Sequence, residues 1–294
     1  MIVVTAPTGN IGRQVVANLL ARDTPVRVVV RDPDRLAGPV RERAEIVVGS
    51  HADPDVVAKA FDGADAVFWL VPPDRQAPDV RRAFLDFTRP AARAFAEAET
   101  LRVVGVSALG RGTAPAADAG LVTASLEMDD LIAASGVAYR ALALPSFMDN
   151  VLRQVAVIRD QGRYYGPSEP GRKMPTCATR DIAAVAAGLL LDDTWSGVDQ
   201  RSVLGPEDLS MLDEVRIMSE VLGRPIEYVR TPLDAFKAQF LAAGASESTA
   251  QAMADMARAK DEGLDAGVAR TAETAGPTTF RAWCEEVLKP AVQS

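Results

Sequence analysis

A glycine-containing loop near the amino terminus has the residue types that bind phosphate groups. The segment Thr5-Ala6-Pro7-Thr8-Gly9-Asn10-Ile11-Gly12 follows the apolar run Ile2-Val3-Val4 and precedes a stretch with helical spacing at 13–22. Glycine lets the backbone approach a pyrophosphate, and a helix N-terminus supplies free N–H groups and a favourable dipole. A strand, a glycine loop and a helix in this order predict a dinucleotide site. The contacts are expected from Thr5, Pro7, Thr8, Gly9, Asn10, Ile11 and Gly12, and the alternative is a structural turn without a ligand.

Ala6 stands where a GxxGxxG pattern would have its first glycine. Alanine is small enough for this position if its φ is negative, and Pro7 is expected to rigidify the turn.

Arg31 follows the second apolar run, at the position that selects between the two nicotinamide cofactors. An acidic residue there binds the ribose 2′-hydroxyl of NAD, whereas arginine accommodates the 2′-phosphate of NADP. Arg35 is a second candidate partner for that phosphate. We therefore predict NADPH as the cofactor. The alternative is that Arg31 only pairs with Asp32 or Asp34 on the surface.

The elements that must position these residues alternate short apolar runs with longer amphipathic stretches. This rhythm predicts an α/β fold of the Rossmann type, with a doubly wound parallel sheet covered on both faces. The strands are expected at 2–5, 26–30, 45–48, 66–71, 102–107, 139–144 and 202–204. Helices are expected at 13–22, 55–61, 79–98, 123–135 and 180–191.

Beyond Pro145 the alternation weakens and helical patterns dominate, at 210–222, 232–243, 246–259 and 280–287. We predict an NADP-binding domain at 1–155, completed by 175–205. A smaller, mainly helical C-terminal substrate lobe is expected at 206–294, together with 156–174.

Composition bounds the location and the partners of the chain. Its 294 residues carry a net charge of −8 with a pI near 4.9, which argues against a nucleic-acid partner because such proteins present basic surfaces. No apolar run is long enough to span a bilayer, and Met1 leads into a strand without a basic leader, so a cytoplasmic location is expected. Cys177 and Cys284 have no spacing typical of metal ligands and are interpreted as packing residues. No metal is expected.

With these motifs in place, the chain resembles the NmrA-like atypical short-chain dehydrogenases. The resemblance rests on the loop 5–12, Arg31, the run 65–73 (Asp-Ala-Val-Phe-Trp-Leu-Val-Pro-Pro) and 106–108 (Val-Ser-Ala). It continues through 147–150 (Phe-Met-Asp-Asn), 180–183 (Arg-Asp-Ile-Ala) and 204–210. That family contains NADPH-dependent quinone, imine and carbonyl reductases, and also redox-sensing regulators that do no chemistry. The chain further resembles ketoreductases of actinomycete aromatic-polyketide biosynthesis.

The resemblance implies further cofactor contacts from His51, Val71, Pro72, Ser107 and Pro145. It also implies that Ala108, Phe147, Met148 and Asn150 line a substrate cleft, and Tyr164 and Tyr165 are expected to form a flap over a flat ligand. Trp69, Met253 and Met256 are interpreted as core residues. The acidic cluster Glu127, Asp129 and Asp130 is interpreted as a solvated helix face.

The usual proton donor of short-chain dehydrogenases, a tyrosine with a lysine four residues later, is missing. The positions four beyond Tyr139, Tyr164, Tyr165 and Tyr228 hold Ala143, Ser168, Glu169 and Pro232. Ser125 stands where the family often has lysine or histidine. The hydroxyls of Ser107 and Ser125 are therefore the catalytic candidates, and the alternative for each is a helix cap or a hydroxyl satisfied within the protein.

Two main functions fit this pattern, beside a third option, a lyase or isomerase on the same fold that would turn over without net loss of NADPH. The first is an NADPH-dependent reductase of a polycyclic aromatic ketone or quinone, in which positioning supplies most of the catalysis. A phenol beside the substrate carbonyl would stabilise the developing oxyanion. The second is a non-catalytic NADP(H) sensor that signals to a protein partner. A small aromatic substrate and a monomer or homodimer are expected for the reductase.

Overall fold

Seven parallel strands form the central sheet of the structure, a computed structural model that describes residues 1–98 and 101–294. The strand order is β10-β6-β5-β4-β1-β2-β3, so the chain winds outward in both directions from β1 and β4. The predicted Rossmann-type doubly wound sheet is confirmed. Its strands are β1 (Ile2–Thr5), β2 (Val26–Val30), β3 (Glu45–Val48), β4 (Ala66–Trp69), β5 (Arg102–Ala108), β6 (Ala138–Leu144) and β10 (Val198–Ser202).

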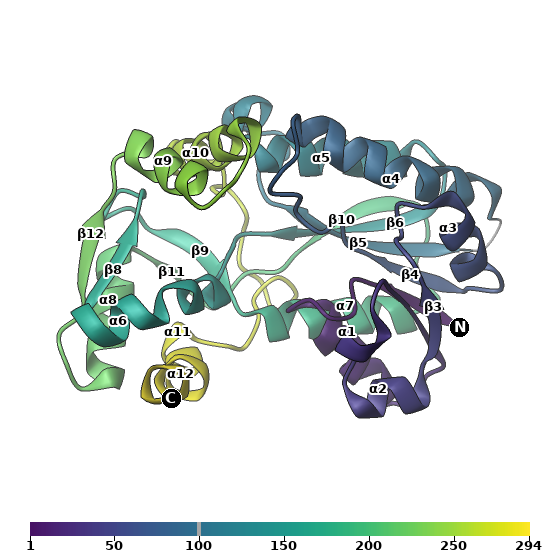
Figure 1. The fold of residues 1–294 in the computed structure, drawn as a ribbon, viewed down its shortest axis with the longest axis horizontal. Helices are drawn as coiled ribbons and strands as arrows, with labels where there is room; N and C mark the ends of the chain where they lie inside the picture. The colour runs from purple at the N-terminus through teal and green to yellow at the C-terminus, as the bar shows by residue number, and fades with distance from the viewer. Residues whose placement is uncertain (99–100) are drawn as a thin grey trace.

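Helices cover both faces of this sheet, as Figure 1 shows. One face carries α3 (Pro54–Phe61), α4 (Val80–Glu97) and α5 (Leu121–Ala133), and the other carries α1 (Gly12–Leu20), α2 (Gly38–Arg43) and α7 (Thr179–Leu191). Successive strand residues point to opposite faces. Val4 therefore packs with the α1 and α7 side chains, and Val3 with those of α4 and α5. The alternate valines of each strand therefore belong to two different hydrophobic cores, one on each face of the sheet, and helices cover both faces.

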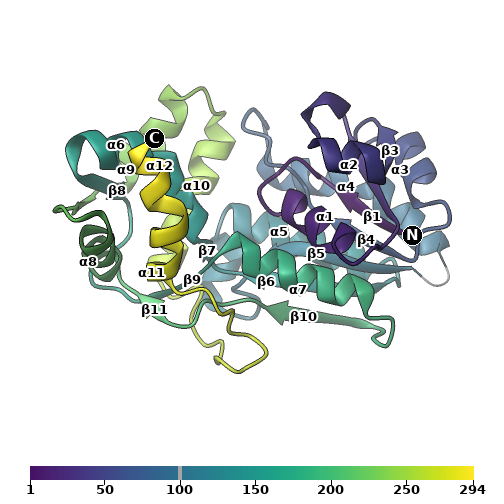
Figure 2. The same cartoon turned by 90° about the horizontal axis from the view of Figure 1, so that it is seen from below.

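The second part of the molecule lies beyond the end of β6 (Figure 2). It contains two small sheets, of order β11-β9-β7 and β12-β8. Its own hydrophobic cluster includes Met148, Ile158, Met218 and Trp283. The strands are β7 (Ser146–Phe147), β8 (Arg163–Gly166), β9 (Met174–Cys177), β11 (Asp208–Leu209) and β12 (Glu227–Arg230). The predicted division at 155 and 206 remains a prediction.

The helices of this second part follow the predicted pattern in most places. They are α6 (Val155–Gln161), α8 (Met211–Leu222), α9 (Leu233–Ala242), α10 (Glu247–Asp261), α11 (Phe280–Trp283) and α12 (Lys289–Gln293). Short turns are η1 (Pro33–Arg35), η2 (Ala114–Asp118), η3 (Met148–Gln154) and the π-helical η4 (Cys284–Leu288). The helix expected at 210–222 begins one residue later, because Ser210 is its N-cap in a capping box with Asp213.

Three further expectations can be compared with the structure. Cys177 and Cys284 are both buried and unbonded to each other, as expected of packing residues. The final third is not wholly helical, since β12 pairs in parallel with β8. None of the helices in the described part of the chain is long and apolar enough to cross a membrane.

Candidate active site

The glycine loop connects the carboxyl end of β1 to the start of α1. The amide of Gly9 donates to the Ala6 carbonyl oxygen at 3.1 Å, which closes a tight turn. A Cβ on Gly12 would lie 2.2 Å from the same oxygen, so only glycine fits there. Within the described residues, the amides of Asn10, Ile11 and Gly12 have no hydrogen-bond acceptor. Unpaired amides at a helix N-terminus are the donors that a pyrophosphate needs, so the loop fits a dinucleotide.

Ala6 does not meet the condition under which alanine is easily tolerated in this turn. Its φ is +49°, in the left-handed region, and not negative. An alanine in this conformation costs roughly 1–2 kcal/mol because its Cβ crowds the following carbonyl. The tight turn around Gly9 and Gly12 imposes this backbone conformation.

Thr5 joins the two central strands at the point where the strand order reverses. Its hydroxyl donates to the Phe68 carbonyl oxygen at 2.9 Å and accepts from the Leu70 amide at 3.0 Å. The side chain is fully buried. Thr5 therefore holds the glycine loop against the loop that carries Val71 and Pro72. Such a reversal point is where ligands bind in open α/β sheets.

Arg31 and His51 lie together beyond the ends of β2 and β3. Asp32 caps η1 by accepting from the Asp34 amide, and Asp34 lies 3.7 Å from Arg41. The Arg31 guanidinium is exposed and has no ion-pair partner within residues 1–98 and 101–294. The alternative that Arg31 pairs with Asp32 or Asp34 is therefore not what the structure shows.

His51 is buried rather than on the surface. Its Nε2 lies 2.9 Å from the Leu70 carbonyl oxygen, and its ring packs edge-on against Trp69 and Phe87. Burial, assisted by the positive charge of Arg31, lowers the pKa of His51 to about 4. The imidazole is thus neutral at pH 7 and donates from Nε2, which fixes the end of β4.

Ser107 belongs to a buried polar network behind the carboxyl end of β5. Its hydroxyl donates to Asp129, and the Tyr139 hydroxyl donates to the same carboxylate at 2.6 Å. Arg111 lies 3.5 Å from Asp129. The interpretation of Asp129 as part of a solvated face is wrong, because the residue is only 4% exposed. Burial raises the pKa of Asp129 to about 6, although the hydrogen bonds from Ser107 and Tyr139 and the charge of Arg111 each lower it.

The network favours one of the alternatives left open for Ser107. Ser107 is a hydroxyl satisfied within the protein, because its proton is shared with Asp129. Tyr139 is fully buried in the same way. Ser125, one helical turn before Asp129 on α5, is also buried, and its hydroxyl has no hydrogen-bond partner among the described residues.

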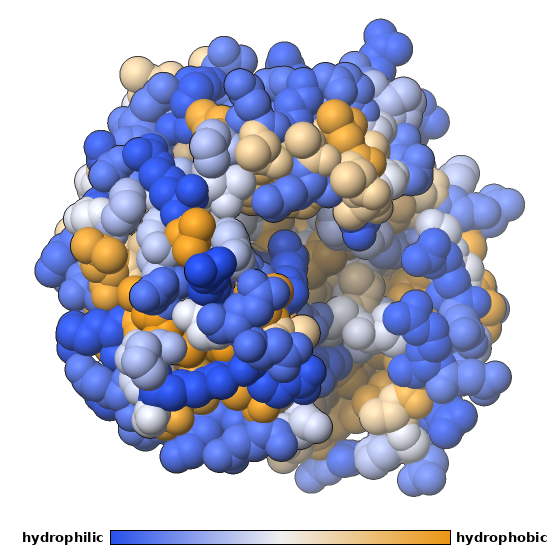
Figure 3. All heavy atoms as spheres, turned by 60° about the vertical axis from the view of Figure 1, so that its left-hand side comes forward, coloured by the Kyte–Doolittle hydropathy of each residue, from blue (hydrophilic) through white to orange (hydrophobic). Residues whose placement is uncertain are grey.

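A cleft of about 560 Å³ lies within the second part of the molecule, between β7, β8, β9 and α8 on one side and α9 and α10 on the other, and Arg75, in the loop after β4, borders it from the Rossmann part. Figure 3 shows the surface deeply hollowed, with apolar colours continuing into the hollow. The expected substrate residues Phe147, Met148, Asn150, Tyr164 and Tyr165 all line this cleft, whereas Ala108 does not. Pro145 is buried directly before it.

Two expectations about the cleft are corrected. Met253 and Met256 of α10 line it, although we assigned them to the core with Trp69, which is fully buried. Tyr164 and Tyr165 do not form a loose flap, since both belong to β8 and pair with β12. The clearest residue that the sequence reading missed is Glu214. Its place between Met211 and Met218, on the apolar face of α8, was an available signal.

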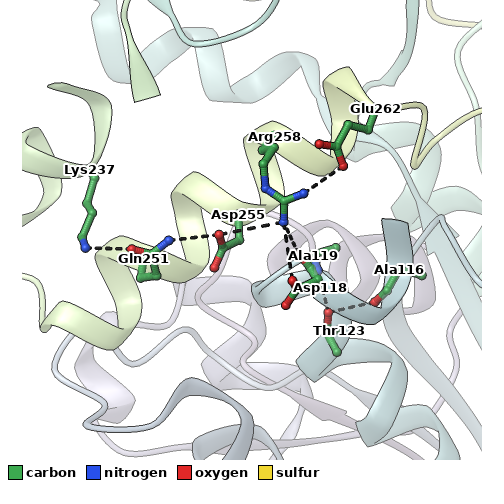
Figure 4. A network of polar contacts seen from close by, with 9 residues as sticks. All are labelled: Ala116, Asp118, Ala119, Thr123, Lys237, Gln251, Asp255, Arg258 and Glu262. Carbon is green, nitrogen blue, oxygen red and sulfur yellow. Dashed lines mark hydrogen bonds and ion pairs between the residues drawn. The ribbon is translucent and has the colours of Figure 1, made fainter. Parts of the chain in front are cut away.

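The α9–α10 hairpin forms the roof of the cleft and is fastened to the Rossmann part at both ends. Ser246 donates its amide to the Arg75 carbonyl and its hydroxyl to the Ala77 carbonyl. At the far end of α10, Arg258 donates to the Asp118 carbonyl at 2.8 Å and pairs with Glu262 (Figure 4). These contacts hold the two methionines over the cleft.

Comparison with known proteins gives a consistent result. Residues 7–193 match the family described as NAD(P)H-binding. The chain is 32% identical to a (4-alkanoyl-5-oxo-2,5-dihydrofuran-3-yl)methyl phosphate reductase of Streptomyces griseus, over 97% of each chain. It is 29% identical to an NAD(P)H azoreductase of Xenophilus azovorans, over 87% of this chain and 86% of that protein. Among solved structures, the triphenylmethane reductase of Citrobacter sp. complexed with NADP(H) superposes with a TM-score of 0.79. That match has 18% identity and covers 96% of this chain and 98% of the other.

Proposed function

Because the chain belongs to the NAD(P)H-binding family, we propose that it is an NADPH-dependent reductase that transfers hydride to a carbonyl of a polycyclic aromatic ketone or quinone. Family membership makes it a nicotinamide-dependent oxidoreductase, and the resemblance to NmrA-like atypical short-chain dehydrogenases is confirmed. The finer assignment, to NADPH and to an aromatic carbonyl compound, is our proposal.

The preference for NADPH is supported by the charges beyond β2. The Arg31 guanidinium is exposed and unpaired in the described structure, while Asp32 is occupied in capping η1. We assign the 2′-phosphate to Arg31 and Arg35, and the pyrophosphate to the unpaired amides of Asn10, Ile11 and Gly12 in the loop 5–12. Val71, Pro72 and Pro145 follow β4 and β6 and would border the nicotinamide half, while Thr5, His51 and Ser107 support the site from behind.

The single observation that carries the substrate class is the cleft itself. It is large enough for three or four fused rings, and Phe147, Met148, Tyr165, Met253 and Met256 line it. Flat apolar side chains and flexible methionines suit a flat aromatic ligand. Ala108 does not line the cleft, so we exclude it from the proposed substrate site.

The proposed chemistry needs little acid from the protein. Reduced nicotinamide would supply the hydride, and we place the acceptor carbonyl at the side of the cleft that Arg75, in the loop after β4, borders. Ser107 and Tyr139 share their protons with Asp129, so neither is a free donor. A phenol beside the carbonyl donates an internal hydrogen bond to the developing oxyanion, and Ser125 is the remaining protein hydroxyl proposed to assist.

Turnover with matched substrates tests this proposal. We expect NADPH oxidation with 1-hydroxyanthraquinone and a rate at least about tenfold lower with 1-methoxyanthraquinone, which lacks the internal hydrogen bond. Equal rates would refute substrate assistance. Tight NADPH binding without turnover on either compound would instead favour a redox sensor.

We also make proposals on the location, oligomeric state and domain division of the protein. We propose a cytoplasmic monomer or homodimer with no nucleic-acid partner, supported by the net charge of −8. We also propose that 1–155 with 175–205 forms the NADP-binding domain and that 206–294 with 156–174 forms the substrate lobe. Light scattering and nucleic-acid gel shifts test the first of these proposals.

A further inference from the structure

Glu214 is a buried carboxyl group at the end of the cleft away from the glycine loop. It lies on α8, which Figure 1 shows on the opposite side of the molecule from α1. The residue is only 6% exposed, and the space it borders is the cleft. Neither of its carboxyl oxygens has a hydrogen-bond or ion-pair partner in the part of the chain that the structure describes. A mostly buried carboxyl group without a protein partner costs folding free energy that an apolar packing residue would not, so we look to a ligand in the cleft for its partner.

Tyr164 is a second polar group at the same place. Its ring borders the cleft from β8, tilted against Tyr228 at a centroid distance of 6.2 Å. The Tyr228 hydroxyl donates to the Ser168 carbonyl, whereas the Tyr164 hydroxyl has no partner among the described residues. Tyr164 packs against the hydrophobic cluster that includes Val215 and Met218 of α8, the helix that carries Glu214. After burial, the charge of Glu214 is the largest cause of the raised pKa of Tyr164. The cleft is thus lined by two hydrogen-bonding groups, one on α8 and one on β8, that have no partner among the described residues.

We propose that the Glu214 carboxyl and the Tyr164 hydroxyl form a binding pair that donates hydrogen bonds to an oxygen acceptor on the far end of the substrate. This inference rests on the proposed function, because it orients the aromatic ligand with its reacting carbonyl toward the cofactor. The ligand is then a flat molecule with a second carbonyl oxygen opposite the first. Such pairing satisfies both buried groups, which are otherwise left without partners.

The protonation state of Glu214 decides which ligand chemistry fits. Burial alone raises the pKa of Glu214 to about 8, so the carboxyl is mainly neutral at pH 7 and can donate. The titratable groups around it are Tyr164 on β8, Tyr228 on β12 and Cys284 on η4. The cations of the cleft, Arg75, Arg153 and Lys260, come from other elements and do not contribute to its pKa. A carbonyl acceptor should therefore bind less well above pH 8, whereas a ligand ammonium group should bind better.

Two matched ligands test the proposal without any turnover. 1,8-Dihydroxyanthraquinone and 1,8-dihydroxy-9-anthrone share the phenol-flanked carbonyl, and only the first has a carbonyl at the opposite position. We would measure their affinities by calorimetry under nitrogen, with NADP⁺ bound so that no reduction occurs. At pH 6.5 the anthraquinone should bind about tenfold more tightly, which is the effect of one well-placed hydrogen bond.

Three variants distinguish loss of the proposed hydrogen bonds from loss of the folded structure. Glu214→Leu and Tyr164→Phe should each reduce this preference, Glu214→Leu to near zero, while NADP⁺ affinity stays unchanged. Glu214→Gln should retain the preference at every pH, whereas the wild-type protein should lose it as the pH rises from 7 to 9. Equal affinities for the wild-type protein, failure of the anthraquinone to bind, or an unchanged preference in Glu214→Leu would overturn the proposal. Because these are binding measurements, failure of reductase turnover is a separate outcome.

Discussion

Ala6 and Gly12 meet across the turn that follows β1. A Cβ on Gly12 would lie 2.2 Å from the Ala6 carbonyl oxygen, and Ala6 itself has a φ of +49°. We expect Ala6→Gly to stabilise the protein by about 1 kcal/mol, because glycine adopts a positive φ without the steric cost. Ala17→Gly, at an exposed site inside α1, is the matched control and should destabilise by about 1 kcal/mol. Chemical denaturation measures both, and a loss of stability in Ala6→Gly would contradict the strain.

Arg31 should distinguish between the two cofactors. Arg31→Ala removes a guanidinium from the proposed 2′-phosphate site, so NADPH affinity should fall about 10- to 100-fold while NADH affinity stays nearly constant. Arg41→Ala is the control, because Arg41 is a nearby exposed arginine beside Asp34. Calorimetry with both nucleotides measures the effect. Equal losses for NADPH and NADH would reject the assignment.

Tyr139 should be structural, not catalytic. Tyr139→Phe removes a hydrogen bond to a buried carboxylate, so the free energy of unfolding should fall by about 1–3 kcal/mol. Turnover per folded molecule with 1-hydroxyanthraquinone should change less than about threefold, because the hydroxyl does not face the cleft. Ser107→Ala should behave similarly. A drop in kcat of a hundredfold or more in either variant would make this network part of the proton path.

Glu214 should make the protein less stable as the pH rises. Its pKa is about 8 in the folded protein and close to the model-peptide value when unfolded, so the folded state binds more protons between these values. Stability should therefore fall as the pH rises from about 5 to 8, and then level off. Glu214→Gln should remove this slope and unfold at a higher temperature at pH 9 than the wild-type protein. Glu97→Gln, at the exposed end of α4, should leave the slope unchanged.

Gly120 should determine how closely α10, which covers the cleft, packs against the Rossmann part. Its φ is +55°, and a Cβ there would lie 2.1 Å from the Ala252 carbonyl oxygen of α10. Gly120→Ala should displace α10 and weaken anthraquinone binding about tenfold or more, since Met253 and Met256 move with it. Gly136→Ala, also at a positive φ but facing open space, should cost about 1 kcal/mol of stability and leave binding intact. Similar binding losses in both variants would disprove a role for this contact.

The sequence predicts the Rossmann part well because its signals are local. Continuous valine runs give β1, β2 and β3 almost to the residue, and the Ser210 cap and Gly223 bound α8. The φ of Ala6 is not predictable in the same way, because the turn imposes it through backbone contacts that residue type does not reveal. The short strands of the second part were missed for a related reason. β8 and β12 become strands by pairing with each other over a long sequence separation.

The sequence predicts the glycine loop of the candidate site, because that loop acts through its backbone. It predicts less well those residues whose role depends on tertiary contacts between side chains. Asp129 lies in a run of acidic residues, and only tertiary packing shows that it turns inward to Ser107 and Tyr139. Met253 and Met256 have ordinary helical spacing, which does not distinguish a core position from the wall of a cleft. Glu214 is the opposite case, since a carboxylate on an apolar helix face is visible in the sequence and indicates a function.

The hydrophobic cluster of the second part takes residues from Met148 through to Val292, and the strand β10 of the main sheet lies between them in sequence. Late segments also return to earlier ones, since Leu204 bridges to Ala275 and α12 packs against α6. This gives the protein a high contact order, so we expect slow folding compared with a helical bundle of similar length. On the ribosome the nucleotide-binding sheet can assemble early, but the hydrophobic cluster of the second part stays incomplete until Val292 has left the exit tunnel. A chain stalled before that point would expose apolar surface and depend on chaperones.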